Sequence, residues 1–141
     1  MSKKSLRKKY QLLEHRTDLK IKVFGRSKKE IFLNSLLAME NYLSPLTGKR
    51  ETRKRKIKLK SIDLEILLAD FLNQILYLNQ TFREIYSGID FKKLSEKEIE
   101  AEILGNKVLG FKREIKAATY HDLKVEKDED NNWQAVILFD I

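Results

Sequence analysis

The longest apolar segment with a regular spacing runs from Ser61 to Gln80 and reads SIDLEILLADFLNQILYLNQ. Its apolar residues recur every three or four positions, a spacing that places them on one face of a helix. The stripe consists of Leu64, Leu67, Leu68, Phe71, Leu72, Ile75 and Leu78. A stripe this wide needs other elements to cover it, so we expect this helix at the centre of the core. Asp63, Asp70 and Tyr77 lie along its polar seam.

The bulk composition suits one compact domain, because the chain has 141 residues and 42% of them are hydrophobic. Cysteine is absent, which excludes disulfides and thiolate zinc sites and is compatible with a reducing cytosol. No apolar run is long enough to span a membrane, and no apolar region follows the basic N-terminus. We therefore expect a cytoplasmic protein with a flexible basic arm over residues 1–9 and a folded domain over residues 10–141.

Shorter patterns flank the central helix. YQLLEH and DLKIKVFG, residues 10–15 and 18–25, alternate as strands on either side of a turn at Arg16–Thr17. Ser27 and Glu30 have the spacing of a capping box, which opens a helix that ends before Pro45. The stretch KIKLK predicts a strand, and residues 82–91, 98–105, 111–127 and 133–140 are rich in strand formers. This order predicts an α+β fold: two helices packed on a largely antiparallel multi-stranded sheet in a single domain.

The last strand ends in AVILFDI, where Asp140 is followed by the α-carboxylate of Ile141. Near the start of the chain, EHRTD places Glu14, His15 and Asp18 at the joint between the first two strands. If these groups meet in space, their carboxylates repel one another unless a cation lies between them, and oxygen ligands favour Ca²⁺ or Mg²⁺. By spacing alone, separate solvated carboxylates are the favoured alternative.

A basic stretch from Lys49 to Lys60 contains eight Lys or Arg residues in a chain of net charge +8. Such a stretch can contact the phosphates of RNA, although it lacks the aromatic residues on which bases stack. It can also be an edge strand that lysines protect from aggregation. The candidate contact residues for RNA or a partner are Arg53, Lys54, Arg55, Lys56 and Lys58.

IKAATYHD offers Lys116, Tyr120 and His121 as a cation, a hydroxyl and a titrating group, although a histidine in this setting is more often structural. No phosphate-binding glycine loop, nucleophile elbow, HExxH or CxxC motif is present. A metal-dependent hydrolase that used the carboxylates would also need a poised base, for which the sequence offers no convincing residue.

Four of these motifs occur in the order of a known family: EHxxD, the helix DLEILLADFLNQILYL, IKAATYHDLKV and the final AVILFDI. Over residues 10–141 the chain resembles archease. The resemblance implies a protein that is not an enzyme but a cofactor of the tRNA-splicing ligase, which is GTP- and metal-dependent. Archeases promote guanylylation of the ligase's active-site histidine and its multiple turnover. Some are linked to a tRNA cytosine methyltransferase as chaperone-like modulators.

The resemblance also implies residue roles. Asp18, Asp140 and Ile141 correspond to the family's metal site, with calcium as the expected ion and Mg²⁺ or Mn²⁺ as alternatives. Lys116 corresponds to a lysine that acts with these aspartates in activating the partner, whereas His15 and His121 receive no role. We predict an acidic tip that approaches the ligase active site. The alternative is a stand-alone RNA-binding protein, or a modulator of the methyltransferase, that acts through Lys49–Lys60.

Overall fold

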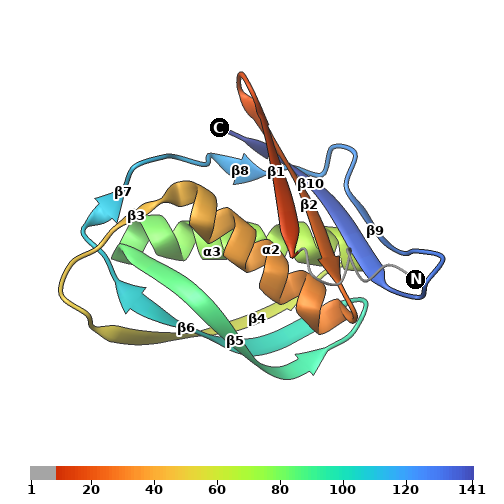
Figure 1. Cartoon of the computed structure of the whole chain (residues 1–141). Helices are drawn as coiled ribbons and strands as arrows, with labels where there is room; N and C mark the ends of the chain where they lie inside the picture. The colour runs from red at the N-terminus through yellow and green to blue at the C-terminus, as the bar shows by residue number, and fades with distance from the viewer. Residues whose placement is uncertain (1–8) are drawn as a thin grey trace.

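The computed structural model describes residues 9–141 and places its helices between two antiparallel sheets (Figure 1). The helices are α2 (Lys28–Leu43) and α3 (Leu64–Phe82). The upper sheet contains β1 (Tyr10–His15), β2 (Asp18–Gly25), β10 (Trp133–Asp140), β8 (Ala117–Ala118) and β9 (Lys124–Lys127). The lower sheet contains β4 (Thr52–Lys60), β6 (Glu98–Lys107) and β5 (Glu84–Leu94). Strands β3 (Pro45–Leu46) and β7 (Gly110–Phe111) pair in a short ribbon.

The predicted fold class is confirmed, with the difference that the strands divide between sheets instead of forming one. Helix α2 contacts β2 above and β5 below, and α3 contacts β8 above and β4 below, so each helix is covered on two sides. One continuous core contains residues of both helices and both main sheets, as expected of a single domain. The predicted basic arm lies outside the described residues except for Lys9. Neither helix in the described part of the chain has the length and apolar character needed to cross a bilayer.

Both helices begin at capping residues. The Ser27 hydroxyl accepts a hydrogen bond from the Glu30 N–H at 3.2 Å, as predicted, but the Glu30 carboxylate accepts from the Arg26 N–H at 3.0 Å instead of from Ser27. Asp63 is the N-cap of α3 and accepts from the Ile66 N–H at 2.9 Å. A side chain at this position satisfies one of the free N–H groups in the first turn of the helix.

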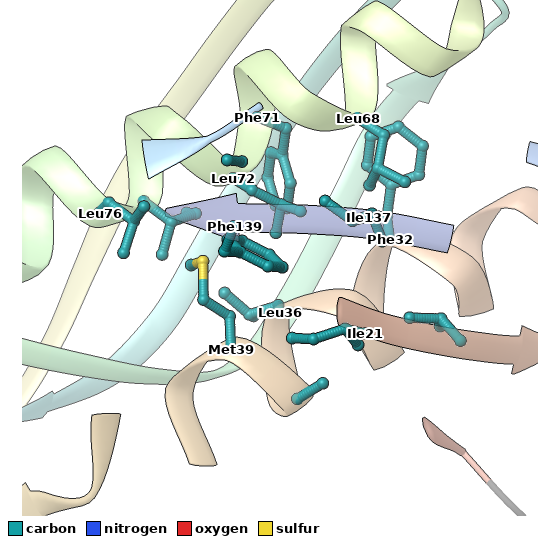
Figure 2. Close-up of a cluster of buried hydrophobic side chains, with 14 of the residues drawn as sticks. Ile21, Phe32, Leu36, Met39, Leu68, Phe71, Leu72, Leu76, Ile137 and Phe139 are labelled. Carbon is teal, nitrogen blue, oxygen red and sulfur yellow. The ribbon is translucent and has the colours of Figure 1, made fainter. Parts of the chain in front are cut away.

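The apolar stripe of α3 lies at the centre of the molecule, as predicted, and all seven of its residues are buried. Figure 2 shows side chains of α2, α3, β2 and β10 converging on one cluster, in which the rings of Phe32 and Phe71 lie 5.4 Å apart. Ile137 and Phe139 of β10 enter this cluster and are fully buried. This packing fixes which face of β10 points inward, so that Asp140, the residue after Phe139, lies on the outer face.

A buried polar network joins α2, α3 and β5. The Glu40 carboxylate accepts hydrogen bonds from Asn79 Nδ2 at 2.7 Å and from the Tyr86 N–H at 3.0 Å. Asn79 Nδ2 also donates to the Glu84 carbonyl at 2.8 Å. Burial raises the pKa of Glu40 to about 8, and these hydrogen bonds offset only part of the increase. At neutral pH this carboxyl group is therefore mostly protonated.

We expect Glu40→Gln to remove a pH dependence of stability. The folded pKa of Glu40 lies above its ordinary value of 4.5, so its stabilising contribution is complete below about pH 4.5 and is lost as the pH rises through about 8. Relative to the variant, the wild type should lose about 4 kcal/mol of unfolding free energy between pH 5 and pH 8.5. Urea denaturation at both pH values measures the difference. Equal differences at the two pH values would show that Glu40 does not titrate in this range.

Candidate functional site

The pairing of β2 with β10 brings Asp18 directly opposite Asp140. Directly opposed residues in an antiparallel pair have Cβ atoms roughly 4.5–5.5 Å apart. Leu19, which follows Asp18, and Phe139, which precedes Asp140, are fully buried. Because successive side chains alternate between faces, both aspartates lie on the outer face of the upper sheet. Two segments more than one hundred residues apart in sequence therefore contribute adjacent carboxylates.

Ile141 lies at the same end of the sheet, since its N–H donates to the Thr17 carbonyl at 2.9 Å. The β1–β2 hairpin that carries Thr17 projects from the molecule near the C-terminus (Figure 1). Its turn is tight, with Arg16 at a φ of 53°, and it places His15 opposite Asp18. We call Asp18, Asp140 and Ile141 the acidic tip.

Lys116 lies on the other side of Asp140. Its N–H donates to the Asp140 carbonyl at 2.8 Å, and Ala117 is the residue of β8 that pairs with Asp140. The Lys116 side chain is exposed. The predicted site residues Asp18, Asp140, Ile141 and Lys116 are thus brought to one end of the upper sheet.

The tip carboxylates have no salt-bridge partner within residues 9–141. Asp18 is half-buried and Asp140 is exposed, and neither forms a salt bridge with a Lys, Arg or His of this range. Like charges directly opposite each other on a sheet destabilise it. A cation between the two side chains would remove this repulsion.

The oxygen atoms of the acidic tip are the type of ligand that a hard cation prefers, but they are few. The side chains of Asp18 and Asp140, with the main-chain oxygens of Ile141, offer only oxygen, which is the ligand type of Ca²⁺ and Mg²⁺. Within the described residues, no group of three or more His, Cys, Asp or Glu side chains is arranged to hold a metal. Since Ca²⁺ takes about six to eight oxygens, an ion held here would keep positions open for water or for groups of a partner.

Tyr120 and His121, which the sequence placed near Lys116, interact with residues outside the acidic tip. The Tyr120 hydroxyl donates to the Asp70 carboxylate of α3, and this hydrogen bond raises the pKa of Tyr120. The His121 ring lies 3.3 Å from the carboxylate of its neighbour Asp122, and both side chains are exposed. The two residues therefore do not extend the acidic tip.

Two of the three arginines of the basic stretch, Arg53 and Arg55, form ion pairs within the protein. Arg55 binds the Glu84 carboxylate with two hydrogen bonds of 2.9 and 2.8 Å and lies 3.8 Å from the centre of the Phe82 ring. Arg53 binds Glu51 at 2.7 Å and lies 3.6 Å from Glu84. Burial alone would raise the pKa of Glu84, but the hydrogen bonds from Arg55 and Tyr86 outweigh it and lower the pKa.

The lysines of the same stretch face solvent. Strand β4 is an edge of the lower sheet, and Lys54, Lys56 and Lys58 are exposed on its outer face. In the register of β4 with β6, Lys56 lies opposite Glu102 and Lys58 lies opposite Glu100. The outer face therefore carries facing rows of opposite charge instead of an unbroken basic surface.

Comparisons with known proteins show the family to which the chain belongs. Residues 10–141 match the Archease protein family (MTH1598/TM1083). The chain is 37% identical over 142 residues to the protein archease of Methanosarcina barkeri, and the match covers 95% of this chain and 97% of that one. It is 38% identical over 144 residues to the protein archease of Methanosarcina acetivorans, with the same coverage of 95% and 97%.

Two solved structures share the fold. The crystal structure of an archease and possible chaperone from Thermotoga maritima superposes with a TM-score of 0.68 at 22% identity, covering 93% of this chain and 96% of that one. The solution structure of protein 1598 from Methanobacterium thermoautotrophicum gives a TM-score of 0.70 at 21% identity, covering 94% and 99%. With the family match over residues 10–141 and relatives above 30% identity along nearly the whole chain, this protein belongs to the archease family.

Proposed function

We propose that this protein is a non-enzymatic cofactor of a GTP- and metal-dependent tRNA-splicing ligase. It promotes guanylylation of the ligase's active-site histidine and so permits multiple turnover. Membership of the archease family supports this role. The observation that carries the proposal is the direct opposition of Asp18 and Asp140 at a projecting end of the upper sheet.

The tip acts by approaching the ligase active site. Asp18, Asp140 and the main-chain oxygens of Ile141 would hold a divalent cation, for which calcium is our first expectation. A cation bound there supplies positive charge that stabilises the charge developing on a transferred phosphoryl group. The carboxylates position that charge, and the projecting hairpin allows the tip to enter a concave site on the partner.

Lys116 supplies a positive charge beside the tip. Because its main chain is bonded to Asp140, the origin of its side chain is fixed relative to the carboxylates. A lysine ammonium is a compact charge on a flexible stem, suited to a phosphate oxygen of the partner's nucleotide. In this proposal the covalent chemistry belongs to the ligase, and this chain contributes ion placement and charge.

We expect Asp140→Asn to abolish most of the stimulation of the ligase. The substitution keeps the size of the side chain and removes one of the two opposed charges that attract a cation. The measurement is RNA ligation under multiple turnover, together with single-turnover guanylylation of the ligase. Asp90→Asn is the matched control, because Asp90 is an exposed aspartate of β5 in the other sheet. If Asp140→Asn stimulates like the wild type, the tip takes no part in activation.

Calcium should reverse the effect of Asp140→Asn on stability. Without metal, removing one of two like charges that lie opposite each other should raise the free energy of unfolding by roughly a few tenths of a kcal/mol. With calcium at one hundred times the dissociation constant, the wild type should gain about 2.7 kcal/mol, which the variant should lack. Thermal denaturation with EDTA and with calcium measures both differences. A wild type that calcium does not stabilise would contradict the metal site.

The triple variant Lys54→Gln, Lys56→Gln, Lys58→Gln should retain stimulation of the ligase. These lysines lie on the outer face of the lower sheet, away from the tip, and two of them face glutamates of β6. We expect a stability cost of roughly 0.2–1 kcal/mol for each lost cross-strand pair. Ligation and RNA binding at low and high salt test this. Loss of stimulation in a folded variant would favour the basic stretch as the functional surface.

A further inference from the structure

The segment that carries Lys116 is tied to α3 by one asparagine. Asn73 Nδ2 donates to the Ala118 carbonyl at 2.9 Å, and Asn73 Oδ1 accepts from the Ala118 N–H at 2.8 Å. Both main-chain groups of Ala118 are therefore satisfied by a single side chain. A primary amide offers a donor and an acceptor side by side without a change of protonation.

On its other side the segment is held to β10 by few contacts. Strand β8 has two residues, and the N–H groups of its neighbours Lys116 and Thr119 donate to the carbonyls of Asp140 and Leu138 at 2.8 and 2.9 Å. The Thr119 hydroxyl also donates to the Leu138 carbonyl, at 2.9 Å. A strand of this length has too few hydrogen bonds to hold its own position, and such segments open locally at low cost. The position of Lys116 beside Asp140 thus depends on additional support.

Helix α3 provides this support along one face. Besides Asn73, Asp70 accepts from the Tyr120 hydroxyl, and Gln80 Nε2 lies 3.4 Å from the Ile115 carbonyl. Residues three or four positions apart, and their multiples, lie on one side of a helix. Asn73 lies between the other two residues of this row and makes two hydrogen bonds, at 2.8 and 2.9 Å.

We propose that Asn73 is a positioning residue of the acidic tip: by clamping Ala118 it fixes Lys116 beside Asp140 in the orientation that activates the partner. This inference rests on the proposed function. Asn73 is not placed to touch the partner's nucleotide, and it acts through the segment that carries Lys116. The row formed by Asp70, Asn73 and Gln80 on α3 then supports the segment that carries Lys116.

The test compares two identical substitutions. Asn73→Asp keeps the shape and the acceptor, removes the donor, and sets a carboxylate against the Ala118 carbonyl. Asn34→Asp is the matched control, since Asn34 Nδ2 of α2 likewise donates to a strand carbonyl, that of Phe24, at 2.7 Å. Phe24 lies at the opposite end of β2 from Asp18, so the control leaves the tip intact. Asn73→Ala removes both hydrogen bonds without adding charge and repeats the test if Asn73→Asp does not fold.

Amide hydrogen exchange on the free protein measures how often the segment that carries Lys116 opens from β10. We expect Asn73→Asp to accelerate exchange of the Lys116 and Thr119 amides roughly tenfold, as for the loss of about one good hydrogen bond, and to leave the amides of β2 unchanged. Asn34→Asp should leave the Lys116 and Thr119 amides at their wild-type rates. Unchanged exchange at these two amides in Asn73→Asp would overturn the inference.

The ligase assay measures how the substitutions change stimulation of the ligase. Asn73→Asp should lower maximal stimulation, whereas Asn34→Asp at an equal or larger loss of thermal stability should keep it. In a Lys116→Ala background, Asn73→Asp should cause no further loss, because a residue that acts through Lys116 has nothing left to position. Full stimulation by Asn73→Asp, or effects of the two substitutions that multiply, would overturn the inference. If instead Asp140→Asn stimulates normally, the proposed function fails, and the exchange rates still decide whether Asn73 fixes the segment.

Discussion

The pairing of β2 with β10 is the interaction on which the site depends. Its register runs from Gly25 opposite Trp133 to Asp18 opposite Asp140. A slip by one residue would turn every side chain of one strand to the other face and would carry a carboxylate into the core. The buried residues of the two strands forbid this slip, because Leu19, Ile21 and Phe139 have no exposed surface. The hydrophobic core therefore sets the geometry of two charged groups that lie outside it.

Local patterns were sufficient to predict much of this arrangement. The first hairpin, with strands at residues 10–15 and 18–25, was predicted with its observed bounds, because alternation and a two-residue turn are properties of adjacent residues. That Asp18 and Asp140 lie opposite each other could not follow from either strand alone. It was an expectation from family resemblance, and the structure supplies the pairing that brings them together.

The features that the sequence did not predict depend on long-range contacts. The charge run did not reveal the partner of Arg53 and Arg55, because Glu84 lies on a strand that follows α3. Their position in phase with buried Ile57 was the available signal. Residues 111–127 read as one strand-forming stretch, yet they form short pieces of β7, β8 and β9. Asn73, which supports one of these pieces, looks in the sequence like any polar residue of an amphipathic helix.

Acidic side chains occur in three kinds of environment in this molecule. Glu40 is buried without a cation, and burial raises its pKa to about 8, so it is mostly neutral at physiological pH. Glu84 is buried with Arg55, which lowers its pKa and keeps the pair ionised. Asp18 and Asp140 lie directly opposite each other near the surface, and neither forms a salt bridge with residues 9–141. Glu40 and Glu84 are thus neutral or paired, whereas these two carboxylates stand side by side at a projecting end. Under the function proposed above, a cation shared with a partner protein would balance their charge.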